Sequence, residues 1–516
     1  MTELLYGSYS GTDAFGKERQ NMNFGTDNTK GKLNRAAHRS LLSFAAVLTA
    51  FLLCGCGIFS LNSPSDKNTD TDDTTSPDTA TETYEIYNGD YANEMISFMN
   101  DLSGKDWNGG ACKIVTSADD LISYDDNSSL VISKEYEERN TAVEETLHIS
   151  ILCEKHASDT MLADIKAANR AGEYFADLIM LPQSQMGAYI ADGAVANLRT
   201  LPGFNYEAGY YYPSSLGAGG GGNAVFAAAG PASLDPDCLS AVYFNTELCE
   251  KAGLESPYDL ADRGEWTVDK YLEYCAAVSS LDGDYASWGA QNTSPYITDL
   301  FYFGCGEKLT NVSLGYYPSI AVGGESALAA MTKVTACVNA GGSVPALESI
   351  NTFASGGSLF LIDSLSTMKA IVNSPCQWGI LPMPKYDTQQ EDYYSLAYYA
   401  DAMFFCVPLT APDYTLAGDL LAALNIYSYG YVRDAYTTDA SYYYLRDNQS
   451  IRMMSIIMEN PVYDMAYTFA DIYDAVPNAT FAAIRNNAGG ISTVERYINM
   501  WGTRFDNAMY QLFDVD

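Results

Sequence analysis

Residues 359–408 constrain the fold more than any other stretch of the sequence. They contain LFLIDSLSTM, then WGILPMPKYD, then YYSLAYYADAMFFCVP, and each segment holds a short apolar run. Gly, Pro or acidic residues bound these runs, which are too short for typical helices. We therefore expect three strands that are buried on both faces, as in the interior of an α/β sheet.

Short apolar runs also alternate with stretches of helical spacing along most of the chain. The predicted strands are 111–115, 147–152, 177–180 and 239–244. The predicted helices are 158–171, 450–459, one that starts after the N-cap Thr267, and a last one with a capping box of Ser492 and Glu495. No internal repeat is visible, so the pattern favours an α/β architecture in two lobes.

The composition excludes several functions. The chain has 516 residues, 47% of them hydrophobic and 18% charged, as expected for a globular protein of two or three domains. A formal net charge of −37 argues against a nucleic-acid partner, which requires clustered Lys and Arg. Only three histidines occur, so neither a metal centre nor histidine-based catalysis is expected. We predict no cofactor and no catalytic residue.

The amino-terminal region reads as an export signal. An apolar run over residues 41–53 follows four basic side chains, Lys30, Lys32, Arg35 and Arg39. A basic region followed by an apolar region of this length is typical of a secretory signal peptide. The alternative is a short buried helix. We expect residues 1–55 to be the signal peptide with an extended basic region, and either Met1 or Met22 to be the start.

The end of the apolar run resembles the bacterial lipobox. It reads Leu53-Cys54-Gly55-Cys56, and the resemblance implies cleavage before Cys56 and a diacylglyceryl group on its thiol. Residues 57–83 contain mostly Ser, Thr, Asp, Asn and Pro, which cannot bury enough surface to fold. We therefore expect residues 56–84 to be a lipid anchor with a flexible tether. The nine remaining cysteines are scattered singly and suggest neither a disulfide framework nor a zinc site.

Several motifs then follow in a recognisable order. They are YFNTEL after a predicted strand, PYDL with GEWTVD, WGILPMPKYD, and LRDNQSIRMM. Together with the lipobox and the tether, they resemble family 1 extracellular solute-binding proteins, the receptors of carbohydrate-type ABC importers in Gram-positive bacteria. The resemblance covers most of residues 105–515.

This resemblance implies a two-lobed, periplasmic-binding-protein-like α/β fold, in which hinge-crossing strands join the lobes and the ligand lies in the cleft between them. The implied N-lobe is 85–240 plus 402–460, and the implied C-lobe is 245–398 plus 461–516. The crossings would fall near residues 240–244, 396–404 and 461.

Candidate ligand contacts come from strand ends and from the resemblance. Ends of predicted strands or nearby loops contribute Thr116, Gln183, Ser184 and Asn292. Tyr296 is similar to a sugar-stacking tyrosine of the maltose-binding branch of the family. Leu181 and Leu365 stand where that branch has stacking tryptophans, which weakens a maltodextrin assignment.

Three further candidates belong to residues 359–408. Asp363 would either accept hydrogen bonds from ligand hydroxyls or cap the following turn. Tyr398 and Tyr399 would alternate on a strand, so that one faces the core and the other the cleft. Which of the two faces the cleft stays open.

The resemblance implies a lipid-anchored receptor on the outer face of the cytoplasmic membrane. It would capture a small solute, a sugar or oligosaccharide, and deliver it to the permease subunits of an ABC importer. Two alternatives remain: a surface lipoprotein enzyme that acts on polysaccharide with two carboxylates, and an adhesin without a small-molecule ligand.

Overall fold

The computed structural model describes residues 89–117, 130–290, 297–313, 315–340, 343–344, 348–469 and 490–513. The chain divides into two compact units, Met1–Tyr84 and Glu85–Asp516, and every described residue belongs to the second unit. The predicted signal peptide, lipobox and tether therefore lie outside the described residues.

A four-stranded sheet combines three strands from the first part of the chain with one strand from much later in the sequence. Its order is β14-β3-β1-β2, with β1 (Gly110–Thr116), β2 (Ile149–Lys155), β3 (Leu178–Pro182) and β14 (Met403–Cys406). The first three strands are parallel, and β14 pairs with β3 in the antiparallel sense. Side chains of β3 alternate between two cores, since Leu178 and Met180 join one and Ile179 and Leu181 join the other. This sheet is therefore covered on both faces.

A five-stranded sheet forms the second layer of strands. Its order is β10-β7-β11-β6-β12, with β6 (Ser240–Asn245), β7 (Ala286–Ala290), β10 (Ser343–Val344), β11 (Ser358–Ser364) and β12 (Trp378–Leu381). β6 is antiparallel to both of its neighbours, while β7, β10 and β11 are parallel. All residues of β6 and β12 are buried, as are six of seven in β11. The prediction of doubly buried strands in residues 359–408 is confirmed for β11, β12 and β14.

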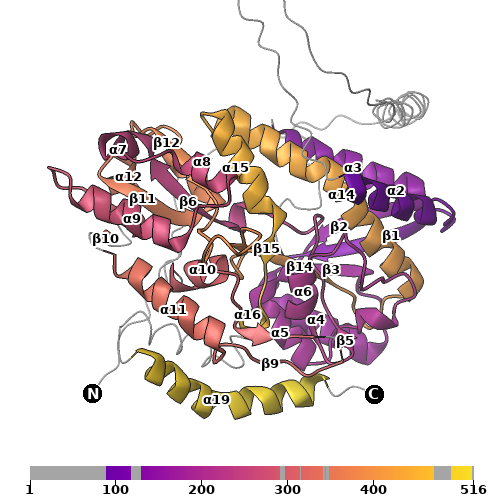
Figure 1. Cartoon of the computed structure of the whole chain (residues 1–516). Helices are drawn as coiled ribbons and strands as arrows, with labels where there is room; N and C mark the ends of the chain where they lie inside the picture. Colours follow the sequence, from indigo (N-terminus) through magenta and orange to yellow (C-terminus); the bar gives the residue numbers. More distant parts are fainter. Residues whose placement is uncertain are drawn as a thin grey trace, which may run out of the picture. The chain divides into compact units, whose positions relative to one another are not determined.

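Helices cover the faces of both sheets (Figure 1). They are α2 (Gly89–Leu102), α3 (Val131–Leu147), α4 (Ser158–Ala171), α5 (Gln183–Ala191), α6 (Pro213–Ala218), α7 (Thr246–Lys251), α8 (Pro257–Asp262), α9 (Val268–Ser279), α10 (Ile297–Gly304), α11 (Glu325–Val338), α12 (Ser349–Ala354), α13 (Met368–Ile371), α14 (Tyr414–Tyr443), α15 (Asn448–Glu459), α16 (Met465–Thr468) and α19 (Gly490–Phe513). The long α14 packs along α3 and also contacts α2. None of the described helices is both long enough and apolar enough to cross a bilayer.

Local signals in the sequence set most of the predicted helix boundaries. α4 ends at Gly172, whose backbone is in the left-handed region (φ 67°), as glycine allows. The side chain of Thr267 accepts a hydrogen bond from the N–H of Lys270, which confirms it as the N-cap of α9. Other boundaries were predicted wrongly; α15, for example, begins at Asn448 and not at Ser450. Leu147 ends α3 and does not start a strand, and α19 begins at Gly490, two residues before the predicted cap Ser492.

Tyr398 and Tyr399 do not alternate on a strand, so that prediction is wrong. They lie between the short β13 (Ser395–Leu396) and β14, in a turn where the N–H groups of Asp401 and Ala402 bind the carbonyl of Tyr398. Both tyrosine side chains are half-buried. The backbone turns after the two residues of β13, so residues 395–406 do not form one continuous strand.

Three segments that are distant in the sequence meet between the two sheets. β13 pairs in parallel with β15 (Pro461–Val462), and Leu239 forms a bridge with Ala397. The N–H of Ala397 donates to the carbonyl of Val462, and the N–H of Tyr398 donates to the carbonyl of Cys238. We call these the connecting segments. They join the part of the chain before β6, the part before β14 and the part after α15.

Asp464, directly after β15, fastens this region to the segment after α10. Its buried carboxylate accepts hydrogen bonds from the N–H groups of Leu309 and Thr310, from the hydroxyl of Thr310 and from the N–H of Ala466. Four donors on one buried carboxylate leave it well satisfied, as a buried charge requires.

Replacing Asp464 with Ala should lower the free energy of unfolding by about 3 kcal/mol or more, because it leaves several buried donors without an acceptor. Urea denaturation measures this loss. The matched control is Asp413→Ala, which removes an exposed N-cap that accepts from the N–H groups of Thr415 and Leu416 and should cost only about 1 kcal/mol. Equal losses in the two variants would contradict the role of Asp464.

Candidate functional site

A cavity of about 440 Å³ opens beside the connecting segments. Its lining is rich in carboxylates and hydroxyls: Asp235, Asp237, Cys238, Asp363, Ser364, Ser366, Tyr398 and Asp401. These residues come from three places: the 3-10 helix η2 (Pro236–Cys238) with its N-cap Asp235, the end of β11 with the following η4 (Leu365–Thr367), and the turn that holds Tyr398 and Asp401.

The antiparallel pairing of β6 and β11 brings these places together. Ser364 at the end of β11 lies opposite Ser240 at the start of β6. The N–H of Leu365 donates to the carbonyl of Leu239, and the hydroxyl of Ser240 accepts from the N–H of Leu396. The residues before β6, the residues after β11 and the turn around Tyr398 therefore share one end of the sheet, where α/β folds commonly place ligands.

One carboxylate of the cavity has a cationic partner. Asp237 forms an ion pair with Lys369, and it also accepts a hydrogen bond of 2.7 Å from the hydroxyl of Tyr436 on α14. Side chains from two helices, Lys369 of α13 and Tyr436 of α14, thus converge on Asp237. This leaves Asp237 fixed in position and less available to a ligand.

Burial affects the pKa of two other carboxylates of the lining. Burial, with the negative charge of Asp237 next to it, raises the pKa of Asp235 to about 6. Burial also raises the pKa of Asp401. Carboxylates in such a setting gain from donors that a ligand brings, because hydroxyl and amine groups can replace the lost water.

Two of the predicted contacts, Asp363 and Tyr398, line this cavity together. Asp363 is completely buried, and its Oδ1 accepts from the N–H of Ser364 at 2.8 Å. This bond fits the capping alternative for Asp363, and its place in the lining fits the ligand alternative. Tyr398 is half-buried and belongs to the same lining.

Three further candidates lie next to this group but do not line the cavity. Tyr399 stacks on Tyr467 of α16, with ring centroids 5.0 Å apart and planes 10° from parallel, and its carbonyl accepts from the N–H of Ser184. Gln183 is buried, and its Nε2 donates to the carbonyl of Asp464. The structure uses Gln183 to join α5 to the segment after β15.

Thr116 does not line the cavity, and three other candidates lie outside the described residues. Thr116 is buried at the end of β1 and pairs in register with Lys155 and Met180 in the four-stranded sheet. Asn292, Tyr296 and Cys56 lie outside the described residues.

Sequence reasoning missed six residues of the lining: Asp235, Asp237, Cys238, Ser364, Ser366 and Asp401. Asp235 and Asp237 precede the strand β6, whereas the candidates predicted from strand ends all follow a strand. They reach the site because β6 runs antiparallel to β11, which an apolar run does not reveal. The cluster Asp235-Pro236-Asp237 directly before a buried strand was the available signal.

A metal role is not supported by the described part of the chain, where no group of three or more His, Cys, Asp or Glu side chains is arranged to hold an ion. The acidic lining is better suited to accept hydrogen bonds. The cavity is therefore a candidate site for a small molecule that donates hydrogen bonds.

Comparison with known families identifies the class. Residues 132–429, more than half of the chain, match the bacterial extracellular solute-binding proteins. The chain belongs to this family, whose members are exported. No curated protein sequence matches the chain.

Solved structures share the fold at low sequence identity. A cyclo/maltodextrin-binding protein complexed with maltotetraose is 13% identical, with a TM-score of 0.51 over 78% of this chain and 99% of its own. A family 1 extracellular solute-binding protein from Bifidobacterium longum subsp. infantis is also 13% identical, with a TM-score of 0.51 over 77% and 99%. The predicted fold class, a two-lobed periplasmic-binding-protein-like α/β fold, is confirmed.

The raised pKa of Asp235 predicts a pH-dependent stability. In the unfolded chain an aspartate titrates at about 3.9, so the folded state holds its proton more tightly than the unfolded state. Stability should fall as the pH rises from about 4 to about 7, because ionisation is disfavoured only in the folded state. Asp235→Asn removes this loss and keeps the oxygen that accepts from the N–H of Asp237.

As the pH rises from about 4 to about 7, the free energy of unfolding of Asp235→Asn should therefore increase relative to that of the unmodified protein by on the order of 1–3 kcal/mol. Urea denaturation at each pH measures this difference. Asp282→Asn, at an exposed position, controls for the loss of one negative charge from an acidic chain. A gain of the same size in both variants, or none in Asp235→Asn, would show that Asp235 is not destabilised in the folded state.

Proposed function

We propose that this protein is a lipid-anchored extracellular receptor that captures a carbohydrate and delivers it to the permease of an ABC importer. One observation carries the proposal: the 440 Å³ cavity lined by carboxylates, serines and Tyr398 at the connecting segments. Membership of the solute-binding family supports a role in capture. The cavity size lies within the range of about 300–1,000 Å³ that small-molecule sites usually have.

The chemistry of the lining favours a ligand rich in hydroxyl groups. Carboxylate oxygens only accept hydrogen bonds when ionised, and serine hydroxyls both donate and accept. A sugar offers many donors in a small volume, and an aromatic ring such as that of Tyr398 can cover its apolar face. A similarly folded protein is known with maltotetraose bound, which supports a saccharide ligand here.

We place the N-lobe at 85–240 plus 402–460 and the C-lobe at 245–398 plus 461–516. The two sheets support this division, since β1, β2, β3 and β14 fall in the first set and β6, β7, β11 and β12 in the second. α15 contacts both α14 and β12, which supports a passage of the chain between the lobes near its end. Closure of the lobes about the connecting segments would enclose the solute.

The permease would recognise the closed state, which the solute stabilises by binding it more tightly than the open state. Anchoring through Cys56 would hold the receptor near the permease. The basic stretch, the apolar run and the lipobox-like sequence that ends in Cys56 support this anchor.

Saturable ligand binding tests the proposal. In a thermal-shift screen of sugars, oligosaccharides, polyols and peptides, we expect a saccharide to raise the melting temperature. A ligand at a hundredfold excess over its Kd stabilises the folded state by about 2.7 kcal/mol. If no saccharide raised the melting temperature while the protein cleaved a polysaccharide, the enzyme alternative would replace the receptor.

Asp401→Asn should then weaken the Kd for the identified saccharide about tenfold, because an amide cannot accept hydrogen bonds through both of its polar atoms. Calorimetric titration measures the change, and Asp282→Asn serves as the control because it lies outside the cavity. An unchanged Kd in Asp401→Asn would remove this carboxylate from the site.

The lipid anchor has its own test. Cys56→Ser should abolish labelling with radioactive palmitate and release the protein from the membrane fraction, because serine offers no thiol for the diacylglyceryl group. Cys54→Ser is the matched control, two residues upstream in the segment that cleavage would remove, and it should keep both properties. Palmitate labelling of Cys56→Ser would place the lipid elsewhere.

A further inference from the structure

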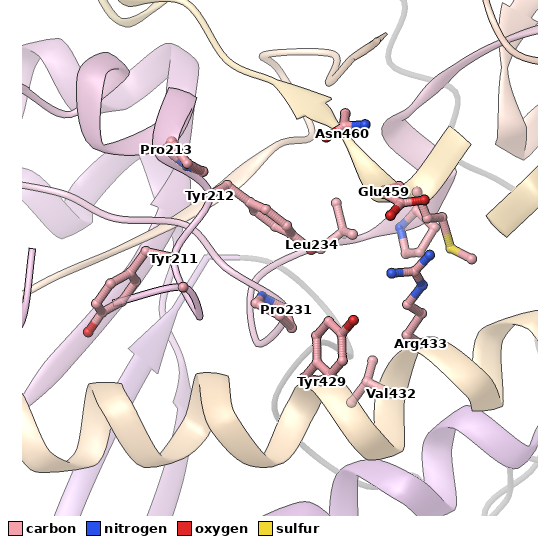
Figure 2. Close-up of a pocket in the computed structure, with 13 residues that line it drawn as sticks. Tyr211, Tyr212, Pro213, Pro231, Leu234, Tyr429, Val432, Arg433, Glu459 and Asn460 are labelled. Atoms are coloured by element: carbon pink, nitrogen blue, oxygen red, sulfur yellow. The ribbon is translucent and has the colours of Figure 1, made fainter. Parts of the chain in front are cut away.

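A second pocket, of about 250 Å³, adjoins the segment that carries Asp235 and Asp237, because Leu234 and Pro236 line it. Figure 2 shows its lining. Aromatic rings and prolines form much of its lining, together with one cation and one anion. The lining residues are Gly209, Tyr211, Tyr212, Pro213, Pro231, Leu234, Pro236, Tyr429, Val432, Arg433, Met458, Glu459 and Asn460.

The walls of this pocket come from elements that the solute cavity does not use. Tyr429, Val432 and Arg433 project from α14, and Glu459 and Asn460 stand at the end of α15. Only the segment 234–238 is shared, because Leu234 and Pro236 face this pocket while Asp235 and Asp237 face the solute cavity. The two sites are therefore distinct and adjacent.

The cation of the pocket is held in place by the protein. Nη2 of Arg433 donates to the carbonyl of Ser455 at 3.0 Å, and the side chain of Arg433 also hydrogen-bonds to that of Tyr429. Figure 2 shows Arg433 reaching from α14 towards Glu459. The guanidinium has five N–H donors, so these two contacts leave donors for a ligand.

Other polar groups of the lining make no hydrogen bond within the described part of the chain. Within the described part of the chain, no ion pair joins Arg433 to Glu459, and neither the carboxylate of Glu459 nor the side-chain amide of Asn460 has a hydrogen-bond partner. The same holds for the hydroxyl of Tyr212, whose ring is fixed by stacking on Tyr463 at 6.1 Å. A cation and an anion that lie near each other without pairing, with aromatic rings along one side of the pocket, are complementary to a molecule that carries both charges close together.

We propose that this pocket is a second ligand site, which binds a free α-amino acid with an apolar or aromatic side chain. Arg433 binds the carboxylate, because a guanidinium presents parallel donors that match the two carboxylate oxygens. Glu459 and the amide oxygen of Asn460 accept hydrogen bonds from the ammonium group. Tyr212, Tyr429 and the prolines cover the side chain. The pocket is smaller than most drug-sized sites, as a ligand of this size requires.

Calorimetric titration of the unmodified protein with three probes tests the ligand class. The probes are L-phenylalanine, phenylacetate, which lacks the ammonium group, and phenethylamine, which lacks the carboxylate. L-phenylalanine should bind, and each of the other two should bind about tenfold more weakly, since each loses one charge-assisted contact. Absence of measurable L-phenylalanine binding, or equal affinity for all three, overturns the proposal without any variant.

Variants then locate the site. Arg433→Gln should weaken L-phenylalanine binding about tenfold and Glu459→Gln by a smaller factor, because Glu459 is exposed and its charge is screened. Arg452→Gln, also on α15 but outside the pocket, and Asp401→Asn in the solute cavity should leave the affinity unchanged. Loss of L-phenylalanine binding in Asp401→Asn but not in Arg433→Gln would assign the amino acid to the solute cavity instead. The proposed carbohydrate function does not depend on either result.

Discussion

The hydrogen bonds among the connecting segments hold the functional part of this protein together. The bridge between Leu239 and Ala397 and the pairing of β13 with β15 join three passages of the chain that are far apart in sequence. Each backbone bond contributes only about 1 kcal/mol net, but together they fix where β6 begins and where the turn of Tyr398 lies. Without them, the lining residues of the solute cavity would have no common location.

The electrostatics of the cavity follow from this arrangement. Bringing the start of β6 against the end of β11 gathers four aspartates around one space, in a chain whose net charge is already −37. Lys369 and Tyr436 stabilise Asp237, whereas burial raises the pKa of Asp235 and of Asp401. A buried carboxylate costs free energy in the folded protein unless a donor binds it. This property suits a binding site better than a structural core.

Much of the fold could be predicted from apolar runs and caps. The runs around residues 359–362 and 378–381 became the buried strands β11 and β12, and Gly172 and Thr267 ended and started helices as expected. These signals are local, so the sequence carries them directly. The resemblance to solute-binding proteins also led to the fold class that the family match supports.

The site was less predictable because it depends on strand direction. Asp363 and Tyr398 were found from their place near strand ends, but Asp235 and Asp237 enter the cavity only because β6 is antiparallel to β11. Gln183 has a polar side chain of the kind that can contact a ligand, yet it is buried and its Nε2 donates a hydrogen bond to the carbonyl of Asp464. Pairing partners and burial are properties of the folded chain, which residue type and spacing alone do not reveal.

A crystal structure with a bound saccharide tests the central claim most directly. The saccharide to use is one that raises the melting temperature of the unmodified protein. We predict that its hydroxyls lie within hydrogen-bonding distance of Asp363 or Asp401, with the ring of Tyr398 against the sugar. A saccharide bound elsewhere, with the cavity that Asp235 and Tyr398 line unchanged and empty, would contradict this prediction.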